Sequence, residues 1–220
     1  MSKVLPAKPL LIMLYGFPGA GKSYFARQLA DTLHAAHIQG DRIRSELFEQ
    51  PRYDKEENDV IAHLMDYMAE EFLAAGMSVI YDTNAMRATQ RRELREMARK
   101  AKAEYVLVWL QIDTESAYAR VGKRDRRRAD DKYAVPLDRA TFDKQLSGMQ
   151  NPQTTEDYVV ISGKHIFDMQ RSAFMKRLRE IGLITPEVAS SNIIKPGLVN
   201  LVPNPTAGRV DMSRRNIIIR

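Results

Sequence analysis

Cysteine is absent from the 220-residue sequence, which excludes disulfide bonds, a thiol nucleophile and zinc–thiolate sites. The longest apolar runs, at 10–15 and 105–110, fall far short of the roughly 20 residues that cross a bilayer. The first residues also lack the continuous apolar core of a secretion signal. We therefore expect a cytoplasmic protein with no membrane partner.

Repeats and low-complexity segments are absent as well, and the composition is that of a globular protein. Hydrophobic residues make up 44% of the chain and charged residues 28%, and the length favours one domain with a small appendage. The formal net charge of +6 suits a polyanionic partner. This balance favours nucleic acid, although kinases of small molecules are often basic too.

One segment indicates a ligand directly. Residues 16–23 read Gly-Phe-Pro-Gly-Ala-Gly-Lys-Ser, which fills every fixed position of the phosphate-binding loop G-x-x-x-x-G-K-[ST]. An apolar run of strand length precedes the loop, and apolar residues at helical spacing follow it, as the motif requires. We therefore predict a nucleoside triphosphate bound with Mg²⁺ by the residues Gly16, Pro18, Gly19, Ala20, Gly21, Lys22, Ser23 and Tyr24.

Strand and helix patterns alternate along the chain, which predicts a parallel sheet with helices on both faces. The expected class is α/β, a three-layer P-loop NTPase of the nucleoside- and nucleotide-kinase type with a five-stranded parallel sheet and an arginine-rich lid. The expected strands are 10–15, 36–39, 77–81, 105–112 and 158–161, and the expected helices are 22–35, 43–48, 55–75, 89–102, 114–124, 137–149 and 167–181.

The chain is expected to divide near residue 182. Residues 1–182 would form the kinase domain, with a lid at about 120–136, and residues 183–220 an extension without an assigned role. The end of this extension, 216–220, reads Asn-Ile-Ile-Ile-Arg and is β-prone. We expect that it can pair with a sheet edge or with another subunit, which would make the protein an oligomer.

Polar residues follow the ends of the second and third expected strands, where ligands bind in parallel sheets. Asp41 and Arg44 come after the second strand, and Asp82, Thr83 and Asn84 after the third. Asp41 is either the base that accepts the proton of an acceptor hydroxyl or the N-cap of the next helix. Asp82 could hold Mg²⁺ or its water shell beside Ser23, or it could contact the substrate. The alternative is that it is an ordinary turn residue.

Two basic stretches need separate interpretations. The first, at 120–128, has the position of a kinase lid, in which arginines meet the charge of the moving phosphoryl group; the alternative is a solvated charge run. We expect nucleotide contacts from its residues Arg120, Arg124 and Arg128. The second stretch, 87–102, is expected to be a solvated helix face, with nucleic-acid tracking along it as the alternative. Only its start, at Arg87, is expected to lie near the site. The four histidines are expected to be structural or on the surface.

Four segments together resemble the 5′-hydroxyl polynucleotide kinase domain of phage end-healing enzymes, within the wider group of P-loop kinases. Besides the phosphate loop these are Asp-Arg-Ile-Arg at 41–44, Asp-Thr-Asn at 82–84 with two arginines at 91–92, and Ala-Val-Pro-Leu-Asp at 134–138. The likeness covers about 10–149. It implies ATP and Mg²⁺ as cofactors and a role in nucleic acid repair.

The resemblance also implies roles for single residues. Lys22, Asp41 and Arg124 would be catalytic, with Asp41 as the general base. Arg44 and Thr83 would hold the acceptor phosphate, with Asp82, Asn84 and Arg87 beside them. The sequence departs from the family after Arg124, where an insertion makes Arg126 or Arg128 an alternative lid arginine.

The leading hypothesis is therefore an ATP-dependent kinase of a hydroxyl, most simply the 5′-hydroxyl of a polynucleotide. A second hypothesis keeps the chemistry and changes the acceptor to a nucleoside, nucleotide, sugar acid or aminoacyl-tRNA. A nucleotide-gated binding module is the third. It is disfavoured because the D-x-x-G and N-K-x-D motifs of GTPase switches are absent.

Overall fold

Five parallel strands form the sheet of this protein, as the sequence predicts. The computed structural model describes residues 6–125, 127 and 131–184. The strands are β1 (Leu10–Tyr15), β2 (Ala36–Gln39), β3 (Val79–Asn84), β4 (Glu104–Gln111) and β5 (Tyr158–Ser162), in the order β2-β3-β1-β4-β5. Every adjacent pair is parallel, so all carboxyl ends of the strands lie at one edge of the sheet.

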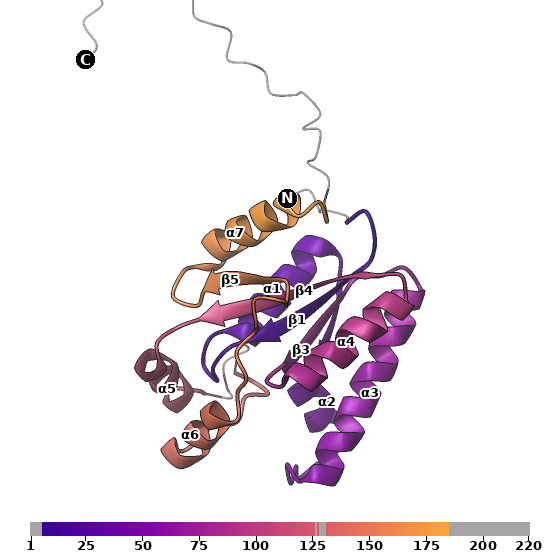
Figure 1. The fold of residues 1–220 in the computed structure, drawn as a ribbon. Helices are drawn as coiled ribbons and strands as arrows, with labels where there is room; N and C mark the ends of the chain where they lie inside the picture. The colour runs from indigo at the N-terminus through magenta and orange to yellow at the C-terminus, as the bar shows by residue number, and fades with distance from the viewer. Residues whose placement is uncertain (1–5, 126, 128–130, 185–220) are drawn as a thin grey trace, which may run out of the picture. The chain divides into compact units, whose positions relative to one another are not determined.

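Helices cover both faces of the sheet (Figure 1). The helices α3 and α4 lie on one face, and α1 and α7 on the other. The helices of the described part of the chain are α1 (Lys22–Leu33), α2 (Gly40–Leu47), α3 (Lys55–Ala74), α4 (Ala88–Lys100), α5 (Thr114–Gly122), α6 (Arg139–Ser147) and α7 (Phe167–Glu180). The predicted three-layer α/β architecture is thus confirmed.

The central strand β1 is buried along its whole length. Because strand side chains alternate between faces, Leu10, Ile12 and Leu14 enter the core beneath α1 and α7. Leu11, Met13 and Tyr15 enter the second core beneath α3 and α4. Apolar contact on both faces holds β1, and the loop that follows it, in a fixed place.

Two element boundaries differ from the sequence prediction in a way that matters for the site. The third strand runs on to Asn84, so Asp82 lies within the strand instead of in a turn after it. The second helix begins at Gly40, and its N-cap is Gln39. Asp41 therefore lies inside the first helical turn, and the alternative that it caps the helix is wrong.

The chain divides into two units, Met1–Thr185 and Pro186–Arg220. The second unit lies entirely outside the described residues, and so does the β-prone end at 216–220. The predicted boundary near residue 182 and the proposed oligomer contact therefore stay predictions. No helix of the described part is long and apolar enough to span a membrane.

The expectation that 87–102 forms a solvated helix face is wrong for Arg91, which is fully buried in α4. Its guanidinium makes a bidentate ion pair with Glu156, at 2.8 Å from Nε and 2.9 Å from Nη2. Its Nη1 donates to the backbone carbonyls of Ala85 and Gln150, both at 2.9 Å. Arg91 thereby ties the exit of β3 to the segment that leads into β5.

We expect Arg91→Ala to lower the free energy of unfolding by about 3–5 kcal/mol, because it leaves the buried Glu156 carboxylate without its counter-ion. Arg92→Ala is the matched control, since Arg92 is the next residue on the same helix and is exposed. Its effect should stay within about 0.5 kcal/mol. Urea unfolding of both variants measures the difference, and equal losses would contradict the assigned role of Arg91.

Candidate active site

The phosphate loop joins β1 to α1 and is closed by its own lysine. Lys22 Nζ donates to the carbonyl oxygens of Gly16 at 2.8 Å and Phe17 at 2.9 Å. The Gly16 N–H donates to Asn84 Oδ1 at 3.3 Å, so β3 supports the start of the loop. Strand exit, loop and helix start thus form the concave backbone surface that the motif predicts for phosphate.

The ammonium group of Lys22 is unusually easy to deprotonate. Enclosure by the loop lowers the pKa of Lys22 to about 8; the Asp82 carboxylate opposes this shift, and Arg124 adds to it. The Lys22 ammonium therefore suits a site for phosphate. The negative charge of a bound phosphate would raise the pKa of Lys22 again and keep the ammonium protonated.

Asp82 lies beside the phosphate loop and is almost fully buried. Its Oδ1 accepts a hydrogen bond from the Ser23 hydroxyl at 3.1 Å, and its Oδ2 lies 2.9 Å from His37 Nε2. The carboxylate therefore bridges the start of α1 and the edge strand β2. The sequence did not indicate a role for His37, because the histidines are not spaced along the chain as metal ligands usually are.

The oxygens of Ser23 and Asp82 fit a magnesium ion. Mg²⁺ is usually held by one or two protein oxygens together with substrate phosphates and water. Consistent with this arrangement, residues 6–125, 127 and 131–184 contain no cluster of three or more His, Cys, Asp or Glu side chains that could hold a metal alone. When bound here, Mg²⁺ would neutralise charge on the β- and γ-phosphate oxygens.

Asp41 shares this electrostatic environment from the first turn of α2. Asp41 is exposed at the surface, yet the protein around its carboxyl lowers the solvation of the charged form, and this is the main cause that raises the pKa of Asp41. The Asp82 charge raises it further, while Arg44, Arg124 and Lys22 act in the opposite direction. Asp41 is therefore close enough to Lys22 and Arg124 for their charges to act on it.

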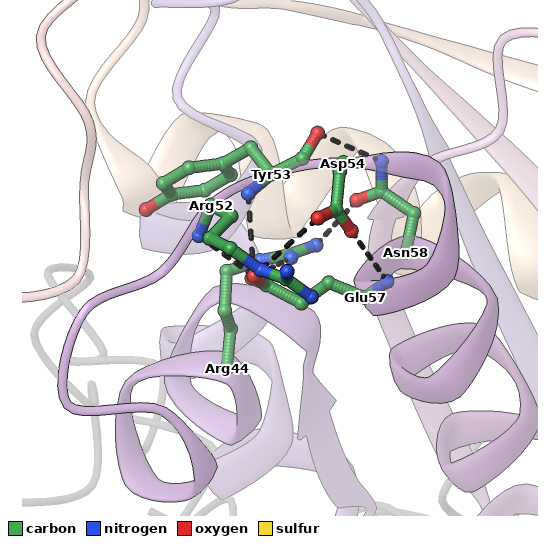
Figure 2. Close-up of polar contacts among 6 residues, drawn as sticks. All are labelled: Arg44, Arg52, Tyr53, Asp54, Glu57 and Asn58. Carbon is green, nitrogen blue, oxygen red and sulfur yellow. Dashed lines mark hydrogen bonds and ion pairs between the residues drawn. The ribbon is translucent and has the colours of Figure 1, made fainter.

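Arg44, one helical turn after Asp41, belongs to a polar cluster where α2 meets the start of α3 (Figure 2). Its Nη1 donates to Glu57 Oε1 and its Nη2 to Asn58 Oδ1 at 2.6 Å. The guanidinium also lies 4.7 Å from the centre of the Tyr53 ring. Its Nε is buried and has no hydrogen-bond partner within the described part of the chain.

Glu57 is the centre of that cluster. Burial on its own would raise the pKa of Glu57, but the hydrogen bonds from Arg44 and from the backbone N–H of Arg52 outweigh it and lower the pKa. The Tyr53 N–H donates to the same carboxylate at 3.3 Å, which helps to hold Tyr53 in a left-handed conformation with φ of 58°. Arg44 is thus fixed in orientation rather than free to swing.

The two described arginines of the predicted lid, Arg120 and Arg124, both donate to backbone carbonyls, and the lid itself stays a prediction. Arg124 Nη1 donates to the Val135 carbonyl at 2.6 Å, and Arg120 Nη1 donates to the Gly163 carbonyl at 2.8 Å. Burial lowers the pKa of Arg124, while Asp131 and Asp41 raise it. Arg126 and Arg128 lie outside the described residues.

The remaining predicted site residues lie at the margin of this arrangement. Thr83 and Asn84 end β3 and are half-buried, whereas Arg87 is the exposed N-cap residue of α4. The ring of Tyr24 is exposed and packs edge-on against Phe167 at 6.5 Å between ring centres. The structure thus brings together Lys22, Ser23, Asp41 and Asp82, with Arg124 in range of their charges.

Two loop glycines give a matched test of how tightly the loop is packed. Gly19 and Gly21 both have positive φ, of 84° and 93°. A Cβ at residue 19 would lie 2.3 Å from the Ala117 carbonyl in α5, whereas a Cβ at residue 21 meets nothing within 4 Å. A side chain at residue 19 would therefore collide with the backbone of α5, whereas a side chain at residue 21 has room.

We expect Gly21→Ala to cost about 1–2 kcal/mol, the strain of a left-handed alanine. Gly19→Ala should cost that amount plus a further ~1–3 kcal/mol, because the loop and α5 must separate. Chemical denaturation of the two variants measures the difference. Equal destabilisation would show that the loop does not pack on α5 as described.

Comparison with known proteins places the chain in a family. Residues 11–152 match the family described as "AAA domain" (AAA_33). The curated L-seryl-tRNA(Sec) kinase of Methanococcus maripaludis is 26% identical over 103 residues, which are 46% of this chain and 40% of that protein. The chain thus matches about two fifths of the length of this relative.

Three solved structures share the fold at lower identity. Kti12 of Chaetomium thermophilum in complex with ADP-AlF3 superposes with a TM-score of 0.63 at 20% identity, over 80% of this chain and 100% of that one. The gluconokinase of Sinorhizobium meliloti has a TM-score of 0.57 and 17% sequence identity, over 79% of this chain and 93% of that one. The APS kinase of Mycobacterium tuberculosis, in complex with AMPPNP and APS, has a TM-score of 0.57 and 17% sequence identity, over 79% of this chain and 99% of that one. The chain therefore belongs to the AAA domain family AAA_33 and has a P-loop kinase-like fold.

Proposed function

We propose that this protein is a kinase that uses ATP and Mg²⁺ to phosphorylate a hydroxyl group. The observation that carries the proposal is the position of Asp41, a carboxylate in electrostatic contact with the loop lysine and the lid arginine. A carboxylate with a raised pKa beside a phosphate loop suits a general base, because its proton affinity is closer to that needed at neutral pH.

In the proposed reaction, Asp41 accepts the proton of the acceptor hydroxyl as its oxygen bonds to the γ-phosphorus. The bond between the γ-phosphorus and the β–γ bridging oxygen breaks, which leaves ADP and the phosphorylated acceptor. Lys22 and Arg124 meet the negative charge on the transferred group. Ser23 and Asp82 would hold the Mg²⁺.

Two classes of molecule could supply the hydroxyl that accepts the phosphate. The four-motif resemblance supports the 5′-hydroxyl of a polynucleotide. The relatives, named for gluconokinase, APS kinase and L-seryl-tRNA(Sec) kinase activities, support a small molecule or an aminoacyl-tRNA. We favour the small molecule or the aminoacyl-tRNA over the polynucleotide. The reason is that Arg44, the proposed contact to an acceptor phosphate, already pairs with Glu57 and Asn58.

We expect transfer of labelled γ-phosphate from ATP to at least one member of an acceptor panel. The panel contains a 5′-hydroxyl oligonucleotide, nucleosides, a sugar acid and seryl-tRNA. Asp41→Asn should lower turnover by roughly 100-fold or more while ATP affinity changes little, because only proton acceptance is lost. Asp31→Asn, an exposed carboxylate on α1, is the control. Binding of ATP without transfer to any acceptor would refute the kinase proposal.

The pKa of Lys22 gives a prediction for nucleotide binding. Well below pH 8 the lysine is charged in both the free and the bound protein, so ADP affinity should change by no more than about twofold from pH 7 to 8. Above pH 8 the free protein loses this proton whereas bound phosphate retains it. Affinity should therefore fall by up to about tenfold per pH unit.

Titration calorimetry with ADP between pH 7 and 10 measures this dependence. Lys22→Met removes the titrating group and should bind more weakly with no break near pH 8. A wild-type affinity that stays constant through pH 9.5 would contradict the lowered pKa.

A further inference from the structure

We propose that His37 is a positioning residue, which holds the Asp82 carboxylate in the orientation that a nucleotide-bound metal requires. The inference rests on the proposed function and adds to it a residue that none of the motifs contains. Its basis is a hydrogen-bonded chain from β2 through β3 to the phosphate loop, formed by His37, Asp82 and Ser23.

The direction of the first hydrogen bond follows from chemistry. An ionised carboxylate can only accept, so the Nε2 of His37 carries the proton that points at Asp82 Oδ2 over 2.9 Å. This holds whether the imidazole is neutral or charged. The other oxygen, Oδ1, is left to face the Ser23 hydroxyl at 3.1 Å. His37 and Ser23 together fix the rotation of the carboxyl group about its own axis.

Burial makes this partner important. The Asp82 side chain is 3% exposed and that of His37 is 18% exposed, so water offers few replacement donors. A buried carboxylate that loses one of its donors must rotate, recruit water or take up a proton. Each response makes the Asp82 oxygen that faces Ser23 a poorer ligand for a cation or for the water shell of the cation.

The fold explains why a histidine can do this. β2 pairs with β3 so that Gln39 lies beside Asp82, which places residue 37 two positions back along the edge strand. From there a side chain must be long and end in a donor to reach Oδ2. Glutamine has about the reach of histidine Nε2, whereas asparagine is one methylene shorter.

The test compares the affinity for ADP with Mg²⁺ present and with EDTA in its place, at one fixed pH. Wild-type protein should show a Mg²⁺-dependent gain in affinity. His37→Ala should lose about tenfold of that gain, in line with other residues that orient metal ligands, with metal-free ADP affinity unchanged within about twofold. His37→Gln should keep the gain, and His37→Asn should lose it as alanine does.

The glutamine and asparagine variants keep the test valid if His37→Ala does not fold, since both retain a polar side chain. His63→Ala, at an exposed position on α3, is the control and should leave both affinities unchanged. Electron paramagnetic resonance of Mn²⁺ in the ADP complex supplies a second readout, in which free Mn²⁺ should increase for His37→Ala and not for His37→Gln.

Three outcomes would overturn the inference: an unchanged Mg²⁺-dependent gain in His37→Ala, equal losses with and without Mg²⁺, or no such gain in the wild-type protein. The kinase proposal fails separately. A wild-type protein that shows the gain and its dependence on His37, yet transfers phosphate to no acceptor, would support the positioning role and refute the reaction.

Discussion

The pairing of β1 with both β3 and β4 is the constraint on which the candidate site depends. β1 is buried on both faces and ends at the phosphate loop, while β3 ends beside it with Asp82 and Asn84. The Gly16 N–H donates to Asn84, and the Ser23 hydroxyl to Asp82. Any shift of β3 against β1 would therefore move the loop and its carboxylate at the same time.

Buried charges with assigned partners recur around this edge of the sheet. Arg91 pairs with Glu156 behind the exit of β3, Arg44 with Glu57 at the corner of α2 and α3, and Asp82 with His37 beside the loop. A buried charge is costly to leave without its partner, so each pair fixes the relative position of the segments that it joins. Such fixed positions suit phosphoryl transfer, in which catalysis rests largely on positioning and charge.

Most of the fold could be predicted from the sequence, because its elements depend on local patterns. Apolar runs of strand length and helical periodicity predicted all five strands and the helices among them within a few residues. The phosphate loop was equally clear, since its geometry needs glycine, lysine and serine at fixed spacing. The lysine at its end donates to two carbonyls of the loop and the serine donates to Asp82.

The features that were missed depend on contacts between distant segments. Nothing local distinguishes Arg91 from the exposed Arg92, because burial of Arg91 requires Glu156, which lies 65 residues away along the chain. His37 becomes informative only when β2 is known to pair with β3. Arg44 was expected at an acceptor phosphate, but its pairing with Glu57 depends on the turn before α3 and could not be read from the D-x-x-R motif.

The charges of the site also limit which partner it can accept. Lys22 and Arg124 both have pKa values lowered mainly by burial, so the free protein holds cations that lack sufficient counter-charge. Asp41 has the opposite problem, since burial and Asp82 disfavour its negative charge. A triphosphate with Mg²⁺ would relieve both: its oxygens would compensate the two cations, and the metal would screen Asp82 from Asp41. In the proposed reaction, Asp41 would then be the carboxylate that accepts the proton of the acceptor hydroxyl.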